Sequence, residues 1–146
     1  MEQARIEYLK KDFVQGFPAY CGFEVEKAAN GRFETRLKLR PEHRQQDGFA
    51  HAGLMATMAD HTAGYAAFTT VPESFRILSI EFKINFFKPA VGNILLCRAE
   101  VIKPGRTIIV AESELFTKAD NEEKSVAKAM VTLMAVAVDN SFSAPS

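Results

Sequence analysis

One segment of the sequence, from Ala52 to about Thr69, restricts the fold more than any other. Eight of the seventeen residues from Ala52 to Phe68 are Ala or Gly, and three more are Leu or Met. This length and composition predict an α-helix. Small side chains around a helix let neighbouring backbone approach closely. We therefore expect the helix to lie inside the domain, wrapped by a curved sheet.

The same segment is apolar enough to compare with a membrane span, which needs about 20 apolar residues. Between Asp47 and Glu73 the only formal charge is Asp60, which His61 follows directly. A charge at the centre of a bilayer costs about 2.5–3.5 kcal/mol. We therefore expect a buried helix of a soluble domain and no membrane partner.

Local signals predict the elements before this helix. Apolar residues at helical spacing predict a first helix over residues 1–13, ended by Gly16 and Pro18. Asn30-Gly31 is the strongest short signal for a β-hairpin. It joins two predicted strands, 21–28 and 32–39.

After Pro72 the hydrophobic period changes to two. Between Leu78 and Phe86 apolar residues alternate with polar ones, so we expect a strand with one buried face. Its other face is too polar for a core and too regular for a loop. Three more strands are expected over residues 94–103, 106–117 and 125–138, following the first in antiparallel succession.

These elements predict one α+β domain over residues 1–146. Residues 1–18 form its N-terminal helical part, and residues 139–146 are expected to be a flexible tail. Eighteen basic residues balance eighteen acidic ones, so we expect no nucleic-acid partner. Two distant cysteines, Cys21 and Cys97, indicate reduced thiols and a cytoplasmic protein.

The sequence predicts no metal site. It has no cysteine pair at zinc spacing and no glycine-rich phosphate loop. His51 and His61 are ten residues apart, which is not the spacing of a helical metal site. We therefore expect neither a metal nor a separate cofactor.

Asp60 is the residue in this helix that most needs an explanation. A carboxylate among apolar residues is costly unless it is hydrogen-bonded or its chemistry is used. A structural role and a catalytic role both remain open at this point. If the helix begins near Ala52, the backbone N–H groups of Ala52, Gly53 and Leu54 are free to polarise a carbonyl oxygen.

Helix geometry links these N–H groups to Asp60. Gly53 and Asp60 share a helix face but lie roughly 10 Å apart along the axis. Groups that act on one carbonyl must lie within about 3 Å of the reacting atoms. If Asp60 is catalytic, the active unit is therefore at least a dimer, with Asp60 of one subunit facing the helix start of the other.

Three stretches resemble one enzyme family. Residues 51–60, His-Ala-Gly-Leu-Met-Ala-Thr-Met-Ala-Asp, are similar to the His-Gly-Gly-(six residues)-Asp signature of hotdog-fold acyl-CoA thioesterases of the phenylacetate-pathway (PaaI) type. Residues 78–89 resemble that family's strand ending in a Pro turn, and residues 103–107 resemble the turn before its fifth strand. The resemblance implies a hotdog fold, an antiparallel curved sheet wrapped around a long central helix.

The resemblance implies a role for each matching residue. Asp60 matches the catalytic nucleophile or general base, and Ser79 matches a serine used beside it. The backbone at Ala52 and Gly53 matches the group that polarises the thioester carbonyl. His51 matches the histidine at the helix entry, and Gln45 matches a side chain that positions water. Lys103 and Arg106 match residues that contact the phosphates of coenzyme A. Lys88 is a further expected contact to coenzyme A.

The resemblance also implies the reaction, hydrolysis of an acyl-CoA to a carboxylic acid and coenzyme A. The expected assembly is a homodimer or a homotetramer built from two dimers, and coenzyme A enters only as part of the substrate. Two alternatives remain, an acyl-CoA hydratase on the same fold and an acyl-CoA-binding module without turnover. Ala52 stands where the signature has its first glycine, and Gln45 stands where some relatives have Asn. The preferred acyl group stays open.

Overall fold

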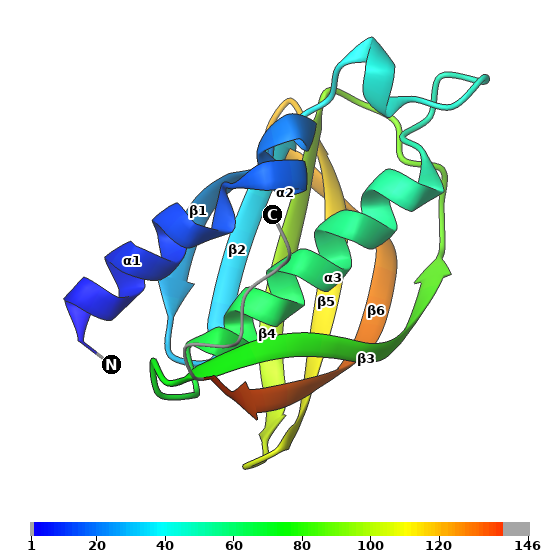
Figure 1. The fold of residues 1–146 in the computed structure, drawn as a ribbon. Coiled ribbons are helices and arrows are strands. Elements are labelled where there is room, and N and C mark those ends of the chain that lie inside the picture. Colours follow the sequence, from blue (N-terminus) through cyan, green and yellow to red (C-terminus); the bar gives the residue numbers. More distant parts are fainter. Residues whose placement is uncertain (1, 139–146) are drawn as a thin grey trace.

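The computed structural model describes residues 2–138 as a six-stranded sheet folded around one long helix (Figure 1). The helices are α1 (Gln3–Phe13), α2 (Gly16–Cys21), the short 3-10 helix η1 (Pro41–His43) and α3 (Ala52–Phe68). The strands are β1 (Glu24–Ala29), β2 (Arg32–Lys38), β3 (Phe75–Phe86), β4 (Ile94–Pro104), β5 (Ile108–Ala119) and β6 (Glu122–Ala137). The predicted α+β hotdog fold is confirmed. The tail predicted over residues 139–146 lies outside the described residues.

Helix α3 runs along the concave side of the sheet (Figure 1). Its alanines Ala59, Ala63 and Ala66 are completely buried. Ser113 of β5 donates its hydroxyl to the carbonyl oxygen of Ala59 at 2.7 Å. A strand side chain can reach helix backbone only where the helix side chains are small, so the high Ala content is what lets the sheet wrap the helix. Among residues 2–138, no helix is both long and apolar enough to cross a bilayer.

The strand order differs from the sequence prediction. The sheet order is β1-β2-β4-β5-β6-β3, with every neighbouring pair antiparallel. The predicted hairpin is confirmed, but β3 does not pair with β4. Helix α3 carries the chain across the sheet, so β3 forms at the far edge and β4 returns to lie beside β2. Among the strands of residues 2–138, β3 therefore pairs only with β6 and has one free edge.

A β-bulge changes the predicted faces of β3. The register against β6 shifts between Ser79 and Glu81, so Ile80 is an extra residue. Ser79 and Phe82 both pair with completely buried residues of β6 and point toward α3, whereas Glu81 points outward. The prediction that one face of this strand is buried is also wrong for the single chain, because no neighbouring strand covers the second edge of β3. The large exposed apolar side chains of β3 are Leu78, Ile80, Phe82 and Phe86.

The N-terminal part contains two helices rather than one. Helix α1 ends at Phe13 as predicted, but Gly16 and Pro18 do not end the helical segment, since α2 begins at Gly16. The positive φ of Gly16, 58°, breaks the chain direction between the helices. Pro18 lies in the first turn of α2, where its missing N–H removes no helical hydrogen bond. The buried ring of Phe13 packs against Phe33 of β2 and anchors this part to the core.

Candidate active site

A hydrogen bond joins the side chains of Asp60 in α3 and Ser79 in β3. The hydroxyl of Ser79 donates to Oδ1 of Asp60 at 2.6 Å. A hydroxyl that donates to a carboxylate at this distance forms a strong, charge-assisted hydrogen bond. In the single chain Asp60 is half-buried rather than buried as expected, because the free edge of β3 leaves its outer side open. The two residues are brought together across 19 positions of sequence by the packing of α3 on β3.

A small cavity of about 210 Å³ adjoins this pair. It lies between the second half of α3 and the first half of β3, which bring aromatic and polar side chains to one space. The residues that line it are Asp60, His61, Gly64, Tyr65, Phe68, Arg76, Ile77, Ser79 and Leu133.

His51 shapes the start of α3. It is the N-cap residue, and its Nδ1 accepts a hydrogen bond from the N–H of Gly53 at 2.8 Å. The ring packs so closely that a Cβ added at Gly53 would lie 3.0 Å from Nδ1 and 3.2 Å from Cε1 of His51. The His-x-Gly pattern therefore has a local cause, since the capping ring leaves little room for a Cβ at position 53.

This cap decides which N–H groups of the helix remain available. Gly53 was expected to offer a free N–H, and that expectation is wrong because His51 accepts it. The N–H of Met55 donates to the carbonyl of His51 at 3.1 Å. Within residues 2–138, the N–H groups of Ala52 and Leu54 have no hydrogen-bond partner.

Gln45 holds the loop that leads into α3. Its side-chain oxygen accepts hydrogen bonds from the backbone N–H groups of Asp47 at 2.6 Å and of Phe49 at 3.1 Å. Gln45, Ala52 and Lys88 line one cavity of about 340 Å³ at the helix start. The structure therefore brings these three predicted site residues together.

The other two predicted contacts to coenzyme A lie near the start of β3, whereas Lys88 follows its end. Lys103 and Arg106 are exposed residues at the turn between β4 and β5, and Arg106 lines a cavity of about 320 Å³ with Phe75. Phe75 precedes Ser79 by four residues, which is about 13 Å along a strand. Within one chain this turn is therefore close to the first half of β3, where Ser79 meets Asp60, and distant from Lys88.

The sequence analysis did not select the polar network behind Asp60. Tyr65 donates its hydroxyl to Oδ2 of Asp12 at 2.7 Å, and Nη2 of Arg76 lies 3.5 Å from the same oxygen. His61 donates its Nε2–H to the carbonyl of Phe13 at 3.0 Å. These contacts join α1, α3 and β3, so no spacing within one element could have revealed them. The one available signal was a charged residue, Arg76, just before an alternating strand.

Burial sets the charge states in this network. Desolvation lowers the pKa of His61 below its ordinary value, although the bond to Phe13 and the charges of Asp60 and Asp12 oppose this. His61 is therefore neutral at pH 7. Burial, the hydrogen bond to Asp12 and the Asp12 charge raise the pKa of Tyr65, so its hydroxyl keeps its proton and acts as a donor.

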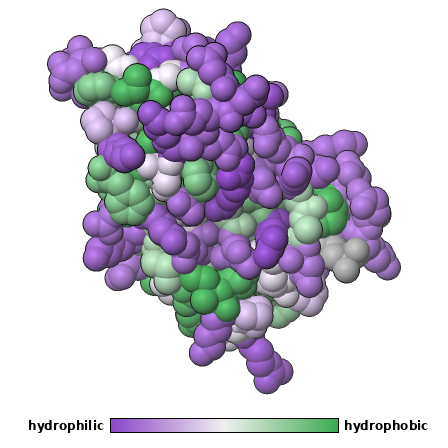
Figure 2. All heavy atoms as spheres, turned by 180° about the vertical axis from the view of Figure 1, so that it is seen from behind, coloured by the Kyte–Doolittle hydropathy of each residue, from purple (hydrophilic) through white to green (hydrophobic). Residues whose placement is uncertain are grey.

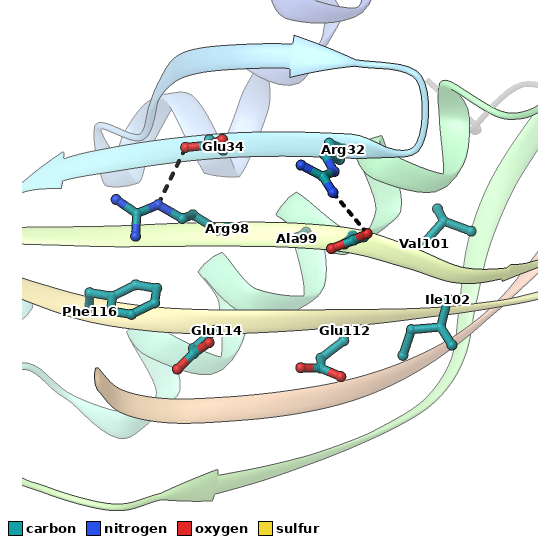
Figure 3. A pocket seen from close by; sticks show the side chains of 10 residues that line it. Arg32, Glu34, Arg98, Ala99, Val101, Ile102, Glu112, Glu114 and Phe116 are labelled. Atoms are coloured by element: carbon teal, nitrogen blue, oxygen red, sulfur yellow. Dashed lines mark hydrogen bonds and ion pairs between the residues drawn. The ribbon is translucent and has the colours of Figure 1, made fainter. Parts of the chain in front are cut away.

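The outer face of the sheet carries a different kind of surface. Figure 2 shows it as mainly hydrophilic, with hydrophobic side chains gathered toward the β4–β5 turn. A hollow on this face is lined by paired charges, including Arg98 with Glu34 at 3.4 Å and Arg32 with Glu100 at 3.3 Å (Figure 3). Exposed ion pairs of this kind contribute little to stability individually. None of the predicted site residues lines this hollow.

No group of three or more His, Cys, Asp or Glu side chains in residues 2–138 is arranged to hold a metal ion. Cys21 and Cys97 are both buried and unpaired. Burial raises the pKa of both thiols, which keeps them protonated.

Comparisons with known proteins agree with this geometry. Residues 47–124 match the sequence profile of the thioesterase superfamily. A thioesterase family protein from Silicibacter pomeroyi is 37% identical, with a TM-score of 0.88 over 92% of this chain and 99% of that one. Acyl-coenzyme A thioesterase 13 of Homo sapiens is 30% identical over 93 residues, which are 63% of this chain and 66% of its own length. A protein from Streptococcus mutans, solved bound to acetyl-CoA, shares the fold with a TM-score of 0.71 and 23% identity over 79% of this chain and 89% of that one.

The profile match begins just before α3 and ends just after β5, so it includes the helix and the strand that meet at Asp60 and Ser79. Fold and profile together define a thioester hydrolase with a hotdog fold. The chain belongs to the thioesterase superfamily.

Proposed function

We propose that the chain is an acyl-CoA thioesterase of the PaaI type, with Asp60 as its catalytic carboxylate. The observation that carries this proposal is the short hydrogen bond from Ser79 to Asp60 beside a cavity. The name of the human relative and the acetyl-CoA bound to the Streptococcus mutans protein support coenzyme A as the thiol part of the substrate.

The proposed chemistry uses water as the second substrate. The Ala52 N–H, which has no partner within residues 2–138, donates to the thioester carbonyl oxygen as negative charge develops there. Asp60 either attacks the carbonyl carbon, giving an anhydride that water then cleaves, or removes a proton from a water molecule that attacks directly. In both routes the carbon–sulfur bond breaks, the acid is released, and coenzyme A leaves as the thiol or thiolate. Ser79 orients the Asp60 carboxylate.

One chain cannot bring these two groups to the same carbonyl. Ala52 and Asp60 are eight residues apart in α3, which is about 12 Å along the helix axis. The proposed active unit is therefore a dimer. Its natural interface is the free edge of β3, because exposed Ile80, Phe82 and Phe86 lie on that strand.

An antiparallel pair of β3 strands would complete the site. If two copies of β3 pair so that Ser79 of one lies opposite Phe86 of the other, residues 79–86 of the two strands overlap. Phe86 lines the cavity that contains Ala52, and Ser79 lines the cavity that contains Asp60. The pairing would bring the helix start of one subunit to Asp60 of its partner, twice per dimer.

A charge on this edge should separate the subunits. Ile80 is 55% exposed in the single chain, so Ile80→Lys should fold, but pairing would bury its ammonium group. We expect a species near the monomer mass of 16.2 kDa by sedimentation, with hydrolysis lost. The matched control is Ile102→Lys on the outer face, where Ile102 is 52% exposed. This variant should keep the dimer and its activity. If two dimers associate through the hydrophobic side chains near the β4–β5 turn, it should also separate that tetramer into dimers. A fully active Ile80→Lys monomer would contradict the shared site.

Lys103, Arg106 and Lys88 are proposed to bind the phosphates of coenzyme A. Arg106→Ala should raise KM for acyl-CoA roughly ten-fold and leave kcat unchanged, because the contact is equally strong in ground and transition states. Added salt should reproduce the effect in the wild type, since exposed charges are screened. Arg32→Ala, which removes an exposed arginine from the outer face, should leave KM unchanged. An unaltered KM for Arg106→Ala would return Arg106 to an ordinary solvated turn residue.

Release of free thiol from a panel of acyl-CoAs tests the proposed function. A thioesterase forms one thiol for each acid, an acyl-CoA hydratase changes the acyl group without releasing thiol, and a binding module does neither. The proposed mechanism uses no metal and no separate cofactor, so the rate should survive dialysis against a chelator. A cytoplasmic location is also proposed, which the two unpaired thiols support.

A further inference from the structure

The cavity beside Asp60 has a basic end. Arg76 lines it at the beginning of β3, three residues before Ser79, which is about 10 Å along a strand. The guanidinium lies over the ring of Phe68, with its carbon 4.8 Å from the ring centre. Asp60 and Arg76 therefore mark two parts of one small space, and an acyl group held at Asp60 can extend toward Arg76.

Arg76 retains unused hydrogen-bond donors. An arginine has five N–H donors, and within residues 2–138 the one polar contact of Arg76 is the ion pair with Asp12 at 3.5 Å. The proposed hydrolysis of a thioester does not involve this guanidinium. The contacts with Phe68 and Asp12 favour this position of the guanidinium, so its other N–H donors are available at the cavity.

We propose that Arg76 selects acyl groups that end in a carboxylate. The inference rests on the proposed acyl-CoA thioesterase function and names its substrate class, the thioesters formed by one carboxyl group of a short dicarboxylic acid. A guanidinium binds a carboxylate with two parallel N–H···O bonds, which a purely apolar acyl tail cannot provide. The cavity of about 210 Å³ in the single chain has room for a short acyl group between Asp60 and Arg76.

The surrounding charges are compatible with one added anion. His61 is neutral because burial lowers its pKa, and Tyr65 is held protonated by its bond to Asp12. Asp60 lies toward the other end of the cavity, next to Ser79. Asp12 competes for Arg76, but its oxygen also accepts the hydroxyl of Tyr65, and its contact with Arg76 is the longer of the two.

A matched pair of substrates tests this selection. Adipyl-CoA and hexanoyl-CoA have the same chain length and differ only in the terminal carboxylate. For the wild type we expect kcat/KM to be at least about ten-fold higher for adipyl-CoA. Arg76→Met should lower that ratio by about ten-fold or more, and Arg76→Lys, which keeps the charge but loses the planar fork, should give an intermediate ratio. Arg32→Met on the outer face should leave both the ratio and the basal activity unchanged.

A variant of Asp12 keeps the test decisive if Arg76→Met folds poorly. Asp12→Asn removes the competing charge and still accepts the hydroxyl of Tyr65, so it should raise the ratio of adipyl-CoA to hexanoyl-CoA about three-fold. Hydrolysis of both substrates with a ratio that neither variant changes would overturn the role of Arg76 and leave the proposed function intact. Failure to hydrolyse either thioester, or any other acyl-CoA, would overturn the proposed function and this inference with it.

Discussion

Asp60→Asn is expected to lower kcat by about 10²–10⁴-fold, which is the usual contribution of a general base or nucleophile. An amide can still accept the hydrogen bond from Ser79 and keeps the size of the side chain, so the fold and the dimer should survive. It can neither attack a carbonyl carbon nor take a proton from water. The measurement is kcat on the acyl-CoA that the wild type hydrolyses fastest, with sedimentation and circular dichroism as checks of assembly and folding.

Asp120→Asn is the matched control. Asp120 lies in the turn between β5 and β6 with φ of 49°, a conformation that Asn also tolerates, and it lines none of the cavities at α3. This variant makes the same carboxylate-to-amide change and should keep full activity. If Asp60→Asn remains folded and dimeric and keeps more than about a tenth of the rate, Asp60 has a structural role and the proposed mechanism is wrong.

The parts of the fold that follow from local pattern were predictable. Helix α3 begins at the predicted Ala52 and ends at Phe68, one residue before the predicted end, because its length and small residues determine it locally. The hairpin at Asn30-Gly31 was also predictable, since a turn with positive φ at glycine is a property of a few adjacent residues; φ of Gly31 is 79°. Ser79 and Asp60, which the family resemblance assigned to one site, are hydrogen-bonded in the structure, and their catalytic roles stay a prediction.

Features that depend on packing between distant segments could not be read in the same way. The place of β3 beside β6 is decided by the path of α3 across the sheet, which no property of β3 itself reveals. The bulge at Ile80 turns Ser79 toward α3, whereas strict alternation placed it with outward-facing Glu81. The position of Arg76 at the cavity was not predicted, because its partners, Asp12 and Phe68, lie on two other elements.

The helix start shows how one local contact revises a site. The family signature suggested the backbone at both Ala52 and Gly53 as donors to the thioester oxygen. The ring of His51 takes the N–H of Gly53, so the proposed donor is the N–H of Ala52, a residue that lines one cavity with Gln45 and Lys88. His51 thus acts on the proposed chemistry through the backbone, by fixing the first turn of α3 and the direction of the remaining N–H.

Ala52→Pro should remove this donor without removing the helix. Proline is tolerated at the first position of a helix, and His51 already has the extended conformation, φ −65° and ψ 136°, that a residue before proline prefers. The loss of one such N–H donor typically lowers kcat by about 10²–10³-fold. Ala52→Gly keeps the N–H and should change the rate little. Equal rates for the proline and glycine variants, both folded and dimeric, would show that the Ala52 N–H takes no part.

Mixing the two inactive variants tests whether the site is shared between subunits. In a heterodimer of Asp60→Asn and Ala52→Pro chains, one site combines the intact Ala52 of the first chain with the intact Asp60 of the second, and the other site lacks both groups. Random assembly makes half of the dimers heterodimers, so co-expression should restore about a quarter of the wild-type activity. Each variant alone should remain nearly inactive. If both groups acted within one chain, every site would lack one of them and no mixture would recover. Recovery in the mixture is therefore the expected result, because about 12 Å of helix separates Ala52 from Asp60 in each chain.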